Sequence, residues 1–89
     1  MLKWLKRLFI KDGTPEGRVS FRQFVQWCNE RACDGCWGIG TAAICIGVME
    51  DVKARPRREQ NKFWLENFEE EVRTQVIEPI NAKIKEGYG

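Results

Sequence analysis

The sequence predicts a small, mostly α-helical domain of three or four helices, with a cysteine knuckle and a long C-terminal helix kinked at Pro79. Three observations lead to this prediction. The chain has 89 residues, of which 43% are hydrophobic and 31% are charged, which is typical of one folded domain with a single core. Apolar residues recur at helical spacing through much of the chain. All four cysteines fall between residues 28 and 45.

We expect one domain over residues 1–89, made of three segments. These are a basic amphipathic segment and loop (1–19), a cysteine-containing core (20–55) and a C-terminal helix (56–89). In a helical conformation, the apolar residues of positions 1–11 fall mostly on one arc and the cations mostly off it. Its polar side and one tryptophan form a candidate partner-binding patch: Lys3, Trp4, Lys6 and Arg7. Three alternatives remain open. The segment can lie on an anionic membrane, its apolar arc can simply be the first element facing the core, or it can form a strand that leads into a turn at Lys11-Asp12-Gly13.

The first clear helix begins at Ser20. Ser20 and Gln23 have the spacing of a capping box, in which each side chain binds the backbone N–H of the other residue. Phe21 and Phe24 follow at helical spacing, and the helix is expected to run to about Arg31. The Asp34-Gly35 pair then predicts a turn.

Residues 37–49 are apolar throughout, and their periodicity does not distinguish a buried strand from a buried helix. The stretch from Thr41 to Arg55 contains no proline and only one glycine, which favours a helix. Pro56 ends this element or begins the next one.

A long helical pattern begins at Arg57. One apolar stripe joins its residues at helical spacing: Leu65, Phe68, Val72 and Val76. Pro79 has no N–H to donate, so we expect a kink or a restart there. We interpret the acidic block as solvated helix surface: Glu66, Glu69, Glu70 and Glu71.

The cysteines have the spacing C-x4-C-x2-C-x8-C, at Cys28, Cys33, Cys36 and Cys45. A C-x2-C unit lets two thiolates approach one metal ion, and four thiolates form a closed, structural zinc site. The chain has no histidine, so a zinc site of the usual kind needs all four cysteines. Such a site would supply stability that a short chain lacks.

Two other interpretations of the cysteines remain open. The first three match the spacing of a plant-type iron–sulfur protein, although the fourth lies closer than in those proteins. Alternatively the cysteines are free and buried, or form one or two disulfides.

The run from Ser20 to Cys36, extended to Cys45, resembles the cysteine knuckles of small phage and prophage proteins. The shared features are a short helix that ends in an aromatic-cysteine pair (Trp27-Cys28), a C-x2-C unit and a fourth cysteine. The resemblance implies a metal-binding knuckle and a mobile-element origin. It also implies that the chain acts by occluding a host or defence protein, as anti-CRISPR-like inhibitors do. No individual residue role is carried over from it.

Composition and motifs lead us to expect a non-enzymatic, protein-binding module. Candidate partner-binding residues lie around a basic stretch: Arg55, Arg57, Arg58, Lys62 and Trp64. The alternative is a small nucleic-acid-binding regulator that uses the basic patch from Lys53 to Lys62, although the net charge is only +2. The partner is a host or phage protein, and the long helix also offers a surface for a homo-oligomer.

The same sequence leads us to expect a cytoplasmic protein without a transmembrane segment. The longest uncharged run, from Gly35 to Met49, is too short to span a bilayer. Cations at Lys3, Lys6 and Arg7 interrupt any apolar region of a signal peptide.

Overall fold

The computed structural model describes residues 14–87, which are mostly helical and contain no strand. The helices are α2 (Phe21–Asp34), α3 (Ile39–Lys53), α4 (Arg57–Asn67), α5 (Glu69–Val72), the π-helical turn η1 (Arg73–Ile77) and α6 (Glu78–Lys85). The mostly α-helical fold class is therefore confirmed. The basic segment, including Lys3, Trp4, Lys6 and Arg7, lies outside the described residues.

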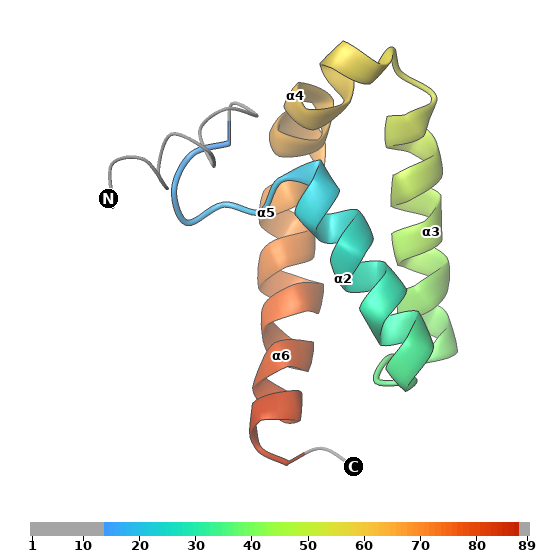
Figure 1. The fold of residues 1–89 in the computed structure, drawn as a ribbon, viewed down its shortest axis with the longest axis vertical. Helices are drawn as coiled ribbons and strands as arrows, with labels where there is room; N and C mark the ends of the chain where they lie inside the picture. The colour runs from blue at the N-terminus through green and yellow to red at the C-terminus, as the bar shows by residue number, and fades with distance from the viewer. Residues whose placement is uncertain (1–13, 88–89) are drawn as a thin grey trace.

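In Figure 1, α2 crosses between α3 on one side and the rod formed by α5, η1 and α6 on the other, while α4 lies at one end. Side chains from α2, α3, α4, α5 and η1 meet in one core. The largest of them, Trp64, is fully buried and stacks on Phe24 with 4.4 Å between ring centroids. Halfway along α2, the Trp27 indole N–H donates to Asn81 Oδ1 of α6 at 2.9 Å. No described helix is long and apolar enough to cross a membrane.

Helix α2 begins with the predicted capping box. The Gln23 backbone N–H donates to Ser20 Oγ at 3.1 Å, and the Ser20 backbone N–H donates to Gln23 Oε1 at 3.0 Å. The helix runs to Asp34, slightly beyond the expected end, and stops at Gly35, which has a φ of 69°. This left-handed conformation favours glycine because it lacks a Cβ atom.

The apolar segment at residues 37–49 is helical rather than a strand, since α3 spans Ile39–Lys53. Pro56 then stands at the N-cap of α4, where its missing N–H costs no helical hydrogen bond. The helix expected over Thr41–Arg55 and the expected role of Pro56 are both confirmed.

The C-terminal helix is not continuous from Arg57. It breaks at Phe68, which has φ −128° and ψ −30°, and Figure 1 shows α4 and α5 running in different directions. A second irregularity is η1, where the Glu78 backbone N–H donates to Arg73 O, five residues back. Pro79 lies in the first turn of α6, where a proline is tolerated. The departures from regular helix therefore lie at Phe68 and η1, before Pro79 rather than at it.

Candidate functional site

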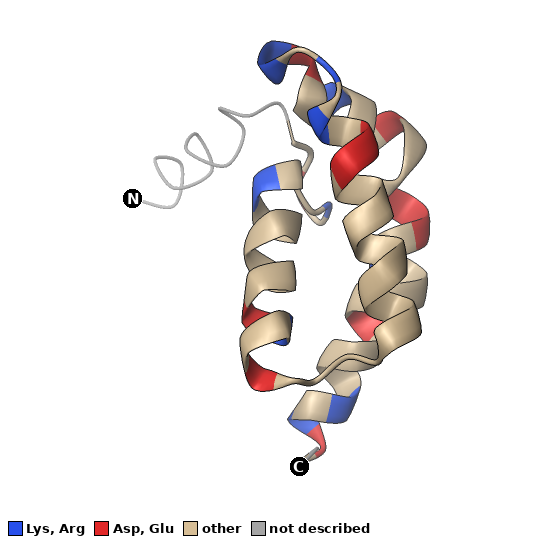
Figure 2. Ribbon diagram, turned by 90° about the vertical axis from the view of Figure 1, so that its right-hand side faces the viewer, with Lys and Arg blue, Asp and Glu red and all other residues tan. Residues whose placement is uncertain are grey.

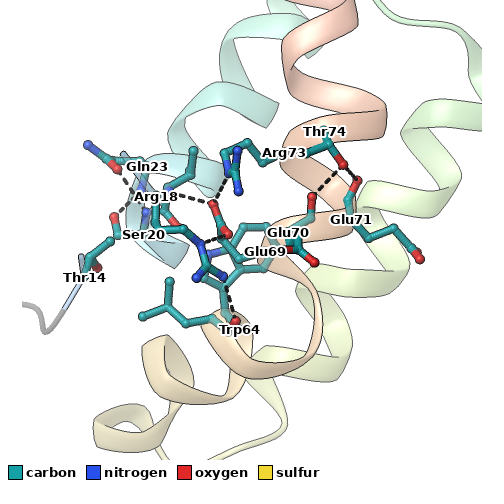
Figure 3. Close-up of polar contacts among 12 residues, drawn as sticks. Thr14, Arg18, Ser20, Gln23, Trp64, Glu69, Glu70, Glu71, Arg73 and Thr74 are labelled. Atoms are coloured by element: carbon teal, nitrogen blue, oxygen red, sulfur yellow. Dashed lines mark hydrogen bonds and ion pairs between the residues drawn. The ribbon is translucent and has the colours of Figure 1, made fainter. Parts of the chain in front are cut away.

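A buried carboxylate lies where the loop before α2 meets the start of α5 (Figure 3). Glu69 is fully buried. Its Oε2 accepts hydrogen bonds from the backbone N–H of Val19 and from Nε of Arg73, each at 2.8 Å, while its Oε1 accepts from Nε of Arg18. Two cations and a backbone donor thus satisfy one carboxylate.

The ionised form of Glu69 is favoured in the folded protein. Burial, the largest single influence, acts to raise the pKa of Glu69. Hydrogen bonds from the Val19 N–H, Arg18 and Arg73 outweigh it, so the pKa is lowered overall. A carboxylate with charged and backbone donors keeps its charge even when it is removed from water.

The surroundings of Glu69 join segments that are distant in sequence. Arg18 also donates to the backbone carbonyl of Leu65 at 3.1 Å, and the Trp64 indole N–H donates to the carbonyl of Val19 at 2.7 Å. These bonds fix the loop before α2 against α4 and α5. The arrangement has a structural role, and the expectation that Glu69 belongs to a solvated surface is wrong.

The burial of Glu69 has a faint signal in the sequence. Glu69 lies four residues after Leu65 and three before Val72, so it shares the apolar stripe rather than the polar face. Arg73 follows it at the spacing of a helical ion pair. The contact with Arg18 has no local signal, because it comes from a different part of the chain.

The structure brings only part of the cysteine set together. Cys28 and Cys45 are both buried in the core, between α2 and α3, whereas Cys33 is exposed and Cys36 is half-buried. Over residues 14–87, no group of three or more cysteine or acidic side chains is arranged to hold a metal ion. The fit of these residues to a four-thiolate shell is therefore poor in this conformation.

The paired thiols also have unequal acidity. The neighbouring thiol of Cys45, followed by burial, raises the pKa of Cys28 well above its usual value. The neutral thiol is therefore the favoured form of Cys28 in this conformation. In this conformation it acts as a small apolar core residue.

The C-x2-C unit forms the end of a helix. Gly35 donates its N–H to Arg31 O at 2.9 Å, and the Cys36 N–H donates to Asp34 Oδ1 at 2.9 Å. Arg31 forms an ion pair with Asp34 at 2.8 Å. Gly35 therefore ends the helix. The backbone N–H groups of Gly35 and Cys36 donate to oxygen atoms of the turn rather than to the cysteine sulfur atoms.

The candidate partner-binding residues on the basic stretch divide into two groups. Arg55, Arg57, Arg58 and Lys62 are exposed, and Arg55 lies over the ring of Phe63, with 4.2 Å to its centroid. Trp64 is fully buried, because its indole fills the core beneath α2. Its assignment to a partner-binding surface is therefore corrected to a core role.

Two of these arginines share a cleft with Lys53, which begins the predicted basic patch, and with Arg22, which the sequence did not single out. Arg57 and Arg58 of α4 line it together with Arg22 of α2 and Lys53 of α3. Arg22 lies within an apolar-periodic helix, and only the packing of α2 against α4 brings it to the basic stretch.

Within residues 14–87, the large apolar side chains that are exposed are isoleucines rather than tryptophans. Ile39, Ile44 and Ile46 of α3 are 92%, 59% and 48% exposed. Ile39 and Ile46 share one side of the helix, and we call these two residues the isoleucine face; Ile44 lies on another side. All charged residues of α3 lie at its C-terminal end, from Glu50 onward; Figure 2 shows the remainder of that helix without charge. A helix that is apolar on all sides is usually covered on all sides.

Comparison of the chain with models of protein families, with curated proteins and with solved structures finds no match. Its class is therefore defined by fold and surface. Residues 14–87 form a small helical domain with a buried ion cluster, a cationic cleft and an uncovered apolar helix face.

Proposed function

We propose that this chain is a non-enzymatic protein-binding module. The observation that carries the proposal is the isoleucine face of α3. Ile39 and Ile46 are seven residues apart and therefore lie on the same side of the helix. Large apolar side chains that gather on one exposed helix face mark surfaces for other proteins.

The chemistry of the described surface supports a binding role over catalysis. The cleft between α2 and α4 is lined by cations, amides and apolar groups, without a carboxylate or thiol for acid–base or nucleophilic work. The most strongly held carboxylate, Glu69, is enclosed by its own partners.

The narrower features of the proposal come from the resemblance of residues 20–45 to phage and prophage knuckles. They are a mobile-element origin and inhibition of a host or defence protein. A structural zinc ion on Cys28, Cys33, Cys36 and Cys45 is a further part of it. Zinc binding would require Cys33 and Cys36 to approach the buried pair, and metal analysis of protein purified without added metal tests it.

The protein-binding proposal is tested by capture from a bacterial lysate with matched variants. Ile39→Glu/Ile46→Glu places two charges on the isoleucine face, and Ala82→Glu adds a charge to an exposed position on α6. We expect a protein to be retained stoichiometrically by the original chain and by Ala82→Glu, and lost with the double variant. Equal recovery of a protein by all three chains excludes the isoleucine face as the binding surface, and recovery of nucleic acid without protein contradicts the proposal.

The second candidate function is a nucleic-acid-binding regulator. The observation that favours it is the gathering of Arg22, Lys53, Arg57 and Arg58 at one site, since cations supply most of the affinity for phosphates. If it is correct, binding to a duplex or a single strand weakens steeply as salt is raised. Arg57→Glu/Arg58→Glu then abolishes that binding.

A further inference from the structure

The strongest unassigned feature is the cleft between the start of α2 and the start of α4. It has a volume of about 880 Å³, which is enough for several side chains of a ligand. Its lining consists of Phe21, Arg22, Val25, Lys53, Arg57, Arg58, Gln60 and Asn61.

The cleft carries positive charge that the described residues do not neutralise. Half of its lining residues are cations and none is acidic. Within residues 14–87, Arg22, Lys53 and Arg57 form no ion pair, and Arg58 reaches only Glu59, at 4.0 Å, with 88% of its side chain exposed. Cations that line one concavity reinforce one another and attract anions.

The walls of the cleft are held in place before any ligand arrives. The Phe21 backbone N–H donates to Asn61 Oδ1 at 2.9 Å, which joins α2 to α4. Phe21 packs against Trp64 with 6.0 Å between ring centroids. Gln60 Nε2 donates to the carbonyl of Arg55 at 3.0 Å, which fixes the turn between α3 and α4. A site with fixed walls loses little entropy on binding.

We infer that this cleft binds a short acidic segment of a partner protein. Carboxylates of that segment pair with Arg22, Lys53 and Arg57, and an apolar side chain lies over Val25. The inference rests on the proposed protein-binding function and names the chemistry of one part of the partner.

An acidic peptide fits this site better than a nucleic acid does. The cations line one concavity together with the apolar residues Phe21 and Val25, whereas a nucleic acid needs a row of phosphate contacts along its backbone. Of the other cations on the stretch, Arg55 already covers the ring of Phe63. The aromatic residue among the lining residues, Phe21, is buried, so it offers little surface on which a base could stack.

The test measures binding of labelled short peptides by fluorescence anisotropy. One peptide alternates glutamate with leucine, a second alternates glutamine with leucine, and a single-stranded oligonucleotide of similar length serves as the competing ligand. We expect the glutamate peptide to bind at least about tenfold more tightly than the glutamine peptide and the oligonucleotide.

Matched variants locate the binding. Arg22→Ala/Arg57→Ala removes two exposed cations of the cleft, and Lys83→Ala/Lys85→Ala removes two exposed cations of α6. We expect the first to weaken binding of the glutamate peptide by about tenfold or more, and the second by less than about twofold. Thermal melts confirm that both variants fold, since all four side chains are exposed.

Three outcomes overturn the inference: no binding of the glutamate peptide at about 1 mM, equal binding of the glutamine peptide, or tighter binding of the oligonucleotide that depends on Arg22 and Arg57. The lysate experiment separates this failure from failure of the proposed function. Capture that depends on Ile39 and Ile46, without peptide binding, overturns the cleft inference alone. Peptide binding without any captured protein supports the cleft and contradicts the protein-binding function.

Discussion

At the scale of single residues, Glu69 illustrates how one buried charge organises a small fold. It gathers Arg18, Val19 and Arg73 around one carboxylate. The desolvation cost of such a group is offset only when every oxygen is satisfied, and removal of one partner leaves charge without compensation. Here the partners come from the loop before α2 and from η1, so the carboxylate binds two parts of the chain to each other.

Glu69→Gln is expected to lower the free energy of unfolding by about 2 kcal/mol, below the range for fully buried pairs because Arg18 and Arg73 are partly exposed. The amide keeps the size of the side chain but leaves Arg18 without a counter-charge and Arg73 with only Glu78, at 3.4 Å. Urea denaturation measures the change. Glu70→Gln, at an exposed neighbouring position, is the control and should change stability by less than about 0.5 kcal/mol.

The lowered pKa of Glu69 also gives stability a defined pH dependence. A group whose pKa is lower in the folded state contributes stability above its unfolded pKa of about 4.3, and the contribution is lost as pH falls through the folded value. The difference in urea midpoint between the original chain and Glu69→Gln should therefore be largest at neutral pH and should disappear in acid. A gap that stays constant down to about pH 3 contradicts this assignment.

Exposure of the thiols predicts an order of reaction with Ellman's reagent. Cys33 should react first, Cys36 more slowly, and the buried Cys28 and Cys45 only after unfolding in urea. The raised pKa of Cys28 adds to its protection. If a four-thiolate zinc site forms instead, all four thiols are protected equally until a chelator removes stoichiometric zinc.

At the scale of helices, some helix boundaries depend on adjacent residues and could be predicted, whereas others depend on tertiary packing and could not. The Ser20–Gln23 capping box and the start of α4 after Pro56 depend on adjacent residues, so the sequence indicates them directly. The break at Phe68 depends on tertiary packing, because it lets Trp64 enter the core while Glu69 meets Arg18. The cationic cleft could be predicted only in part for the same reason. Arg57 and Arg58 are adjacent in the sequence, whereas Arg22 comes close to them only after folding.

Ser20→Ala is expected to lower the free energy of unfolding by about 1 kcal/mol. The substitution removes the acceptor for the Gln23 N–H and half of the reciprocal cap. Urea denaturation of Gln26→Ala, an exposed position inside α2, provides the comparison. A loss as large at Gln26 as at Ser20 means that general helix propensity, and not the cap, decides the stability of α2.

At the scale of the whole molecule, a small core must support three exposed features: the isoleucine face, the cationic cleft and the cysteine turn after α2. The fully buried side chains are few, and Trp64 is the largest of them. It stacks on Phe24, contacts Phe21 and donates to Val19 O. The loop before α2, α2 itself and α4 therefore depend on the same side chain.

Substitution of Trp64 therefore tests how the whole fold depends on one residue. A domain of this length has about 4 to 13 kcal/mol of total stability, and Trp64→Ala should remove about 4 kcal/mol, so circular dichroism should show a chain close to unfolding. Trp64→Phe retains an aromatic ring on Phe24 but loses the hydrogen bond to Val19, and should cost about 2 kcal/mol. Trp37→Phe, at a half-buried position, is the milder control.

Because Trp64 lies in the core, folded Trp64→Phe protein should still capture the partner of the isoleucine face. Loss of capture without loss of helicity would mean that Trp64 belongs to the binding surface after all.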